Sequence, residues 1–300
     1  MKTLVVLLGP TGVGKTELAL TLAQRYATPI ISADSRQMYA GMTIGTAAPT
    51  REQLARVRHY FVGQLQPTEY YSAARFEADV LKLAAELFEK HDILLMTGGS
   101  MLYIDAVCKG IDDIPTIEAE TRQMLRRRLA DEGLETLKAE LRLLDPQYYE
   151  QADLKNTQRI VHALEVCYQT GKPFSSFRTH SAKPRPFDIV RIGLCRPREE
   201  LFARINSRVD QMVADGLMDE ARRLLPYRQE NALNTVGYKE MFAVIDGTWT
   251  LEQATERMKK NTRVYAKKQM TWFQRDKDIR WFHPDQTQEI TDYLDSIRKN

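Results

Sequence analysis

The sequence predicts an α/β protein in which a parallel β-sheet flanked by helices is interrupted by a small all-helical domain. Short apolar strand patterns alternate with helical patterns through the first third of the chain. A glycine-rich loop joins the first strand to the first helix. From about residue 113 to about Gly171 we find helical patterns without a convincing strand, then a loop rich in Lys, Pro and Arg at Ala182–Pro186, after which a strand pattern returns. Strands that alternate with helices are typical of a parallel sheet covered on both faces.

The elements of the sheet region follow one another in a simple order. Each strand is a short apolar run, and each helix carries its apolar residues on one face. We predict strands at Thr3–Leu8, Ile30–Ala33, Ile93–Thr97 and Ile189–Cys195, and helices at Lys15–Tyr26 and Ala73–Lys90, with further helices from the last strand to about Lys277. Four such strands are enough for one continuous sheet.

The helical block divides the sheet region into two parts. We therefore predict a discontinuous core at 1–112 and 186–300, with a helical insertion at 113–185. Within the insertion, a capping asparagine precedes an apolar stripe, and a glycine and a proline follow it. That helix is expected to have Asn156 as its cap, to bury Ile160, Ala163, Leu164 and Cys167, and to end at Gly171 and Pro173.

Composition excludes several classes of protein. The 300 residues are 43% hydrophobic and 28% charged, which is typical of a globular chain and not of a disordered one. No apolar run approaches the roughly 20 residues that span a bilayer. The three cysteines and five histidines show no zinc or disulfide pattern. We expect a cytoplasmic protein without membrane contact.

The net charge of +3 hides an uneven distribution. Nine basic residues lie between Glu256 and Arg280, against three acidic ones. We call these nine the basic stripe: Arg257, Lys259, Lys260, Arg263, Lys267, Lys268, Arg275, Lys277 and Arg280. Such a stripe can bind a polyanion, although a solvated helix face has the same composition.

The clearest motif is a phosphate-binding loop. Gly9, Pro10, Thr11, Gly12, Val13, Gly14, Lys15 and Thr16 match G-x-x-x-x-G-K-[ST] between a predicted strand and a predicted helix. Glycines let the backbone N–H groups approach phosphate oxygens, and the helix N-terminus adds partial positive charge. Lys15 adds a full charge, and Thr16 is a candidate ligand for Mg²⁺. The motif predicts a P-loop NTPase-like core.

The motif does not by itself identify the reaction. NTPases usually carry an acidic residue at the end of a second strand, yet Ile93–Thr97 is followed by Gly98, Gly99 and Ser100. The acid instead follows Ile30–Ala33, at Asp34. Because strand carboxyl ends face the ligand in such sheets, we expect Asp34 beside the phosphate loop. It could hold Mg²⁺, take a proton from a nucleophile, or simply cap a turn.

Further segments resemble the tRNA dimethylallyltransferase (isopentenyltransferase) family, in order along nearly the whole chain. They are Asp34–Tyr39, Gly45–Pro49, Tyr71–Phe76, Gly98–Tyr103, Arg159–Val166, Gly171–Phe174, Gly237–Glu240, Ala266–Gln269 and Thr271–Phe273. The family has Thr where this chain has Ser100, and His59-Tyr60-Phe61 departs from its usual His-His-Leu. We see neither a zinc-finger extension nor a transit peptide, and expect a bacterial-type member.

This resemblance implies a reaction. A dimethylallyl group would pass from dimethylallyl diphosphate to N6 of the adenosine immediately 3′ of the anticodon in tRNA, releasing diphosphate. The phosphate loop would bind the isoprenoid diphosphate with Mg²⁺. Asp34 would act as the base, and Arg208 and Thr11 would act at the reacting groups, unless Arg208 is only a surface ion-pair partner of Asp210 or of a neighbouring acid.

The resemblance also implies an RNA-binding surface, with a flipped base read in a pocket and the helical insertion touching the anticodon arm. Its residues would be Asp34, Ser35, Arg36, Gln37, Ser100, Met101, Gln123, Gln158, Arg159, Ile160, Val161, His162, Asn234, Thr235, Val236, Gly237, Tyr238 and Lys239. The segment 158–162 could equally be an ordinary polar helix face. We expect the protein to be a monomer.

Three alternatives remain at this stage. A phosphate-loop small-molecule kinase would need a lid with arginines; Arg126–Arg128 could serve, but they lie in a helix-like run without a flanking glycine hinge. An adenylate isopentenyltransferase would transfer the same group to free nucleotides. A non-catalytic nucleotide switch or RNA-binding protein would not depend on Asp34.

Overall fold

The computed structural model describes residues 2–179 and 182–298. Met1, His180, Ser181, Lys299 and Asn300 belong to the predicted domain ranges but lie outside the described residues. The chain divides into two compact units, Met1–Lys109 with Pro184–Asn300, and Gly110–Lys183. We call them the sheet unit and the helical unit. Their boundaries differ by two or three residues from the expected 113–185.

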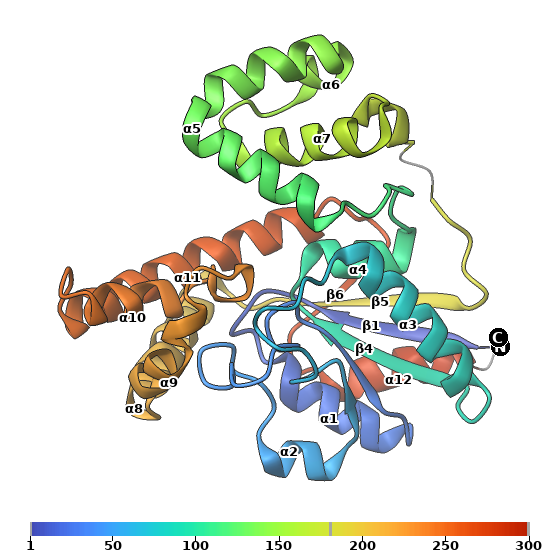
Figure 1. Ribbon diagram of the computed structural model, residues 1–300. Helices are drawn as coiled ribbons and strands as arrows, with labels where there is room; N and C mark the ends of the chain where they lie inside the picture. The colour runs from blue at the N-terminus through green and yellow to red at the C-terminus, as the bar shows by residue number, and fades with distance from the viewer. Residues whose placement is uncertain (1, 180–181, 299–300) are drawn as a thin grey trace. The chain divides into compact units, whose positions relative to one another are not determined.

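The sheet unit contains six parallel strands in the order β3-β2-β4-β1-β5-β6 (Figure 1). The strands are β1 (Thr3–Leu8), β2 (Ile30–Ala33), β3 (His59–Tyr60), β4 (Ile93–Gly98), β5 (Asp188–Leu194) and β6 (Arg280–Phe282). The α/β class with a parallel sheet is confirmed. The four predicted strands are present, and β3 and β6 extend the sheet at its two edges.

The central strand β1 is completely buried, and its side chains alternate between two hydrophobic cores. Leu4, Val6 and Leu8 face the core on the side of α3 (Ala73–Phe88) and α4 (Met101–Lys109). Val5 and Leu7 face the core on the side of α1 (Lys15–Arg25) and α12 (Thr287–Arg298). This alternation is the period of two that a strand imposes. Figure 1 shows the two pairs of helices on opposite faces of the sheet.

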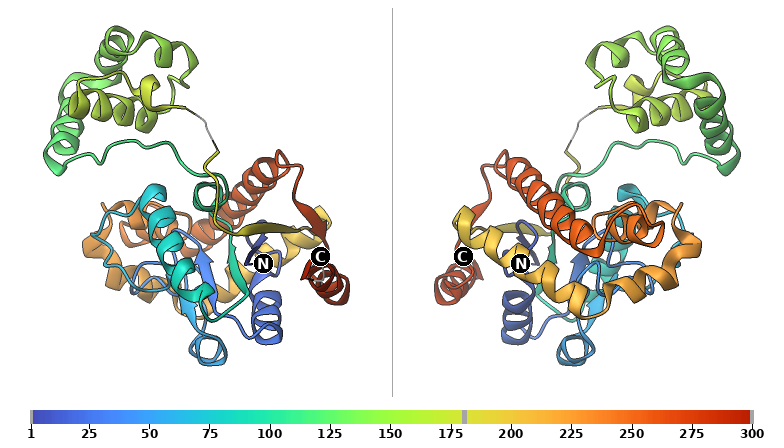
Figure 2. Two further views of the ribbon diagram at one scale, coloured as in Figure 1. Left: turned by 90° about the vertical axis from the view of Figure 1, so that its right-hand side faces the viewer. Right: turned by 90° about the vertical axis from the view of Figure 1, so that its left-hand side faces the viewer.

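Helices of the sheet unit surround these cores. They are α1 (Lys15–Arg25), α2 (Arg51–Arg56), α3 (Ala73–Phe88), α4 (Met101–Lys109), α8 (Arg198–Ala214), α9 (Leu217–Leu224), α10 (Tyr238–Ile245), α11 (Leu251–Phe273) and α12 (Thr287–Arg298). Short 3₁₀ turns follow at Leu225–Tyr227 and Asn231–Leu233. Figure 2 shows α8 and α11 side by side, where they pack against each other.

Strand register brings three loops to the same edge of the sheet. Leu8 pairs with Gly98, and Ala33 pairs with Gly98 from the other side. The phosphate loop, the segment after Asp34 and the Gly98–Ser100 turn therefore all leave the sheet at its carboxyl edge. Residue 98 must lack a side chain here, because a Cβ would collide with the backbone of Ala33.

The helical unit has a core of its own. Its helices are α5 (Ala119–Leu144), α6 (Pro146–Gln151) and α7 (Thr157–Thr170), followed by a 3₁₀ turn at Phe174–Phe177. Asn156 caps α7 by accepting a hydrogen bond from the Arg159 N–H at 3.2 Å, and Gly171 ends it at φ 67°. The predicted stripe of Ile160, Ala163, Leu164 and Cys167 is buried, as expected.

The sequence-based statement that no glycine hinge flanks Arg126–Arg128 in α5 is wrong. Gly133 has φ 80° and ψ 170°, outside the helical region, and it breaks α5 in the middle. Arg126–Arg128 are therefore followed within one or two turns by a glycine hinge that the pattern did not indicate. No helix in the described part of the chain has the length and apolar character needed to cross a membrane.

A buried ion pair fixes the chain as it re-enters the sheet unit. Arg185 pairs with Glu77 at 2.6 Å, and both side chains are less than one-tenth exposed. Arg185 also donates to the carbonyls of Ala106 and Val107, at 2.7 and 2.8 Å, in the last turn of α4. The segments that leave and re-enter the sheet unit are thus joined at one point.

Candidate active site

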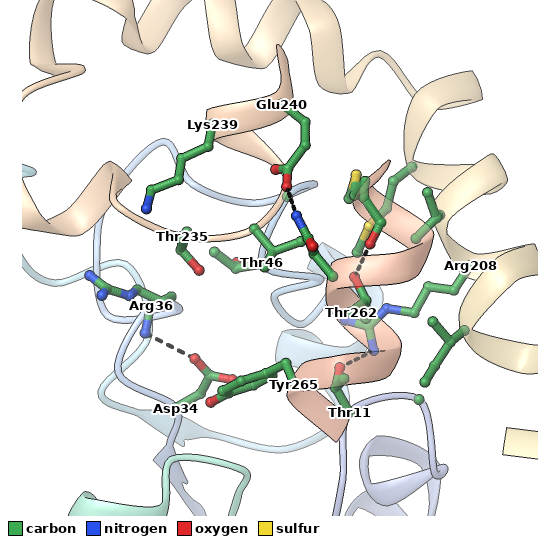
Figure 3. A pocket seen from close by; sticks show the side chains of 18 of the residues that line it. Thr11, Asp34, Arg36, Thr46, Arg208, Thr235, Lys239, Glu240, Thr262 and Tyr265 are labelled. Atoms are coloured by element: carbon green, nitrogen blue, oxygen red, sulfur yellow. Dashed lines mark hydrogen bonds between the residues drawn. The ribbon is translucent and has the colours of Figure 1, made fainter. Parts of the chain in front are cut away.

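A cavity of about 450 Å³ opens at the carboxyl edge of the sheet, entirely within the sheet unit (Figure 3). The phosphate loop, the segment after β2, α8 and α11 form its walls, together with residues 234–240. Eleven of the predicted site residues line it: Thr11, Gly12, Asp34, Ser35, Arg36, Ser100, Arg208, Asn234, Thr235, Val236 and Lys239. Site residues that were predicted in distant segments of the sequence therefore line one cavity.

Arg208 and Thr11 are in direct contact. The Arg208 Nη1 donates a hydrogen bond to the Thr11 Oγ1 at 3.3 Å. The alternative ion pair with Asp210 does not form, because Asp210 pairs with Lys259 at 2.8 Å. Arg208 projects from α8 on the same side as Ile205, Val209 and Met212, which also line the cavity. The guanidinium thus lies between the phosphate loop and an apolar wall.

Lys15 is held against the loop that precedes it. Its Nζ donates to the carbonyls of Gly9 and Pro10, at 2.9 and 2.8 Å. Burial and, after it, the positive charge of Arg208 lower the pKa of Lys15 to about 7, while Asp34 acts in the opposite direction. Burial likewise lowers the pKa of Arg208. Two half-buried cations, Arg208 in the cavity wall and Lys15 behind the phosphate loop, have a single carboxylate nearby, which makes this end of the cavity a site for an anion.

Asp34 lies beside these cations and is also bound to its own turn. Its Oδ1 accepts hydrogen bonds from the backbone N–H groups of Arg36 and Gln37, at 2.9 and 3.3 Å. The turn-cap interpretation is therefore correct for this oxygen. Among the described residues, none donates a hydrogen bond to Oδ2. One oxygen fixes the carboxylate, and the other remains available to a substrate.

Ser35 and Ser100 connect the Asp34 turn to the end of β4. The Ser100 hydroxyl accepts from the Ser35 N–H at 2.8 Å and donates to the Ser35 hydroxyl at 3.1 Å. Ser100 is buried at 8% exposure. A hydroxyl is the feature that Ser shares with the family's Thr, so this departure from the pattern keeps the bond that holds the turn.

The wall formed by α11 was missed by sequence reasoning. Met258, Asn261, Thr262 and Tyr265 line the cavity from one face of this helix. Their spacing of three and four residues is the signal that was available, but it is embedded in the basic stripe. Burial and the negative charge of Asp34 raise the pKa of Tyr265 to about 12, which keeps its hydroxyl neutral at physiological pH.

Glu240 ties α11 to the segment that enters α10. It accepts from the Asn261 side-chain amide at 2.7 Å and from the Gly237 N–H at 2.7 Å. Gly237 has φ 101°, a left-handed conformation that favours glycine. Other lining residues that sequence reasoning did not select include Gly45, Thr46, Met212 and Glu240 itself.

Several predicted RNA-binding residues of the sheet unit do not line the cavity. Tyr238 is completely buried and donates its hydroxyl to the Glu220 carboxylate at 2.7 Å, so its side chain is not at the surface. Gln37 donates to the carbonyls of Thr46 and Ala47. Met101 is half-buried in the first turn of α4.

The predicted residues of the helical unit divide by exposure. Gln123, Gln158 and Arg159 are exposed. Ile160 is completely buried in the core of the unit, which corrects its place among surface residues. Val161 and His162 are half-buried, and the His162 Nδ1 lies 3.3 Å from the Glu165 carboxylate.

Comparison with known proteins identifies the family. The family model described as IPP transferase matches residues 37–276. This chain belongs to the IPP transferase family. It is 64% identical over 295 residues to tRNA dimethylallyltransferase 1 of Phocaeicola vulgatus, covering 98% of each chain. It is 60% identical over 298 residues to the protein of that name from Bacteroides fragilis, covering 99% of each.

A solved structure of the same family supports the fold. The tRNA isopentenylpyrophosphate transferase of Bacillus halodurans superposes with a TM-score of 0.72 at 35% identity, over 99% of this chain and 96% of that one. The resemblance seen in the sequence is thereby confirmed, and the chain is a prenyltransferase of the IPP transferase family.

The candidate metal ligand of this IPP transferase family member is an exposed hydroxyl. Thr16 follows Lys15 in the first turn of α1 and is exposed. Over residues 2–179 and 182–298, no group of three His, Cys, Asp or Glu residues is arranged to hold a metal ion. A magnesium ion here would therefore depend on substrate phosphate oxygens and water for most of its ligands, as Mg²⁺ commonly does.

Proposed function

We propose that this protein transfers a dimethylallyl group from dimethylallyl diphosphate to N6 of the adenosine immediately 3′ of the anticodon in tRNA. The observation that carries the proposal is the meeting of Thr11, Arg208 and Asp34 in one cavity. It combines an anion site, a free carboxylate oxygen and an apolar wall. These are the three environments that a diphosphate, an attacking amine and a dimethylallyl group require.

The diphosphate is assigned to the phosphate loop. In the proposed reaction, the bond between the allylic carbon and the diphosphate oxygen breaks, and the electron pair leaves with the diphosphate. Lys15 and Arg208 stabilise that developing charge. Anion binding also offsets the repulsion between these two cations, which adds to the larger effect of burial in lowering the pKa of Lys15 in the free protein.

Asp34 is assigned as the base. The exocyclic amine of adenine is a poor nucleophile and carries an extra proton once the new C–N bond has formed. The Oδ2 of Asp34 accepts this proton, while Oδ1 keeps its hydrogen bonds to the turn. Tyr265, a neutral phenol on the α11 wall, provides an aromatic face for the flipped base.

The dimethylallyl group is assigned to the apolar wall of α8. Ile205, Val209 and Met212 follow one another along this helix from the phosphate loop, at the spacing of one helix face. Burial of a five-carbon group against them contributes to binding without any polar contact.

Magnesium is proposed as the metal cofactor. Thr16 would supply one protein oxygen to the ion, with the diphosphate supplying others. Bound Mg²⁺ would neutralise the leaving diphosphate.

The tRNA is proposed to contact both units. The exposed Gln123, Gln158 and Arg159 would meet the anticodon arm, and the basic stripe would contact phosphates. We propose a monomer as the active form, acting in the cytoplasm.

The test is a transfer assay. Protein, Mg²⁺ and radiolabelled dimethylallyl diphosphate are incubated with unmodified tRNA and, separately, with AMP, and Asp34→Asn protein is the control. Label in tRNA with wild-type protein but not with the variant is expected. Label in AMP instead would reassign the substrate to free nucleotides. No label in either, with ATP consumed on a small acceptor, would favour a kinase and overturn the proposal.

A further inference from the structure

Gln269 is a buried polar side chain that the reaction described above does not use. It lies on α11, one turn after Tyr265, and is only 2% exposed. Its Oε1 accepts a hydrogen bond from the Thr11 N–H at 2.9 Å. Its Nε2 donates to the Gly99 carbonyl at 2.8 Å. The side-chain amide of Gln269 thus accepts a hydrogen bond from the backbone of one loop and donates one to the backbone of another.

These two loops are the ones that follow β1 and β4 at the carboxyl edge of the sheet. The approach of Gln269 is close, since a Cβ at residue 99 would collide with its amide nitrogen. The glycine therefore makes room for the glutamine. These two hydrogen bonds join the phosphate loop, the β4 turn and α11 at one buried point. In sequence, Gln269 is 258 residues from Thr11 and 170 residues from Gly99.

The bond from Thr11 sets the orientation of that residue. In a phosphate-binding loop, backbone N–H groups usually point at the anion. Here the Thr11 N–H is already bonded to Gln269, and the Thr11 hydroxyl is bonded to Arg208. Thr11 accordingly presents its hydroxyl, and not its backbone amide, towards Arg208.

The bond to Gly99 leads to the base. The next residue is Ser100, whose hydroxyl is bonded to both the backbone and the side chain of Ser35. Ser35 in turn follows Asp34, whose Oδ1 is bonded within the same turn. Hydrogen bonds and short backbone segments therefore run from Thr11 through Gln269 to Asp34.

We propose that Gln269 is a positioning residue that fixes the separation between the diphosphate site at Thr11 and the base at Asp34. This inference rests on the proposed transfer reaction. Gln269 touches neither reacting group; it acts by holding the backbones that carry them. A displacement of about 1 Å between reacting groups can cost on the order of a hundredfold in rate, whereas binding of each substrate depends less on that separation.

Loss of this spacing has a distinctive chemical consequence. When the amine is misplaced, water can attack the same allylic carbon. The carbon–oxygen bond still breaks and diphosphate still leaves, but the product is dimethylallyl alcohol, with the proton of the attacking water released. The ratio of diphosphate released to dimethylallyl transferred therefore rises when positioning fails. A smaller fraction of folded enzyme lowers both quantities equally and leaves this ratio unchanged.

The experiment compares three variants of the full chain. Gln269→Met keeps the length of the side chain and removes both hydrogen bonds. Gln269→Glu keeps an acceptor for the Thr11 N–H and replaces the donor to Gly99 by a carboxylate oxygen. Gln274→Met, at the exposed C-cap of the same helix, is the matched control. Thermal unfolding verifies that each variant is folded, and the assay measures diphosphate release, transfer to tRNA, kcat and KM.

The expected result is a fall in kcat of about tenfold or more for Gln269→Met, with the KM for dimethylallyl diphosphate within about threefold and a higher release-to-transfer ratio. Gln269→Glu should show the same direction, and Gln274→Met should match the wild type. A folded Gln269→Met with wild-type kcat and ratio would overturn the inference while leaving the proposed function intact. If wild-type protein releases no diphosphate and transfers nothing to tRNA, the proposed function itself fails, and the assignment of Gln269 fails with it.

Discussion

The guanidinium of Arg208 donates a hydrogen bond to the hydroxyl of Thr11, and this contact joins α8 to the phosphate loop at the cavity. The two residues are 197 positions apart in sequence. Through it a helix with an apolar face is fixed beside an anion site. A substrate with a charged head and a short apolar tail fits this arrangement, because each part meets the wall that suits it.

Replacement of Arg208 tests the anion site. Arg208→Met removes a half-buried cation from the cavity and should lower kcat by about a hundred- to a thousandfold, because charge on the leaving diphosphate is no longer stabilised. Arg204→Met is the control: Arg204 is exposed and donates to the Gly12 carbonyl, at 3.1 Å. Steady-state kinetics with saturating tRNA measure both. Equal effects of the two substitutions would contradict the role given to Arg208.

Replacement of Asp34 tests the base. Asp34→Asn keeps a carbonyl oxygen that can accept from Arg36 and Gln37, so the turn should persist. It removes the proton acceptor, and kcat should fall by about a hundred- to ten-thousandfold. The Kd for dimethylallyl diphosphate, measured by calorimetry, should change less than about threefold. Retention of full transfer activity would remove Asp34 from the mechanism.

The lowered pKa of Lys15 leads us to predict that diphosphate binding depends on pH. Its pKa of about 7 in the free protein means that the ammonium is present below pH 7 and lost above it. Bound diphosphate favours the ammonium, so binding at higher pH requires uptake of a proton. The Kd should therefore rise between pH 7 and 9, by up to about tenfold per pH unit.

Calorimetry at pH 7, 8 and 9 with dimethylallyl diphosphate measures this dependence. Lys15→Met should bind more weakly at pH 7 and show a much flatter profile. An unchanged slope in the variant would assign the proton to another group.

Two substitutions of Tyr265 distinguish a role of its ring in stacking from a role of its hydroxyl in hydrogen bonding. Tyr265→Phe keeps the ring, and the KM for tRNA should stay within about twofold. Tyr265→Ala should raise that KM by about tenfold, because stacking of a base on an aromatic side chain contributes roughly 1–3 kcal/mol. Both values come from transfer kinetics with varied tRNA. A larger effect for Phe than for Ala would show that the hydroxyl, not the ring, is required.

Arg159 tests the proposed tRNA contact of the helical unit. Arg159→Glu reverses an exposed charge at the N-terminal turn of α7 and should weaken tRNA binding by about tenfold at moderate salt. The affinity for dimethylallyl diphosphate should not change. Arg142→Glu is the control, because Arg142 is an exposed arginine in the last turn of α5, at the other end of that helix from the predicted contact Gln123. Filter binding at several salt concentrations distinguishes the two, and equal losses would indicate only a general charge effect.

The parts of the site that could be predicted without the family resemblance are those whose chemistry is local in sequence. The phosphate loop is a continuous motif, and Asp34 follows directly from the end of β2. Tyr265 and Asn261 could not be found this way, because their neighbours are mostly lysines and arginines, a pattern typical of a solvated helix. The packing of α11 against α8 and α10, together with the hydrogen bonds of Gln269 and of Asn261, brings that face to the cavity.

The fold shows the same division. The strands that the sequence predicted have four to seven residues, whereas β3 and β6 have two and three residues and carry no readable alternation. They form because β2 and β5 provide partners for them. Ile160 shows the opposite case: its helical spacing already indicated a buried position, and the family resemblance alone suggested a surface role.

The attachment of Arg185 to the last turn of α4 has a consequence for cooperativity. The chain leaves the sheet unit after α4 and returns at Arg185, and the hydrogen bonds of Arg185 hold these two points together. Residues 110–183 therefore form a loop whose two ends are fixed to each other on the sheet unit. The entropic cost of closing such a loop grows only slowly with its length. Folding or unfolding of residues 110–183 therefore places little strain on the joined segments at Arg185 and α4. The helical unit can therefore melt, lengthen or be exchanged for a short turn while the cavity keeps all of its lining. The same closed base would let the two units unfold as separate transitions upon heating.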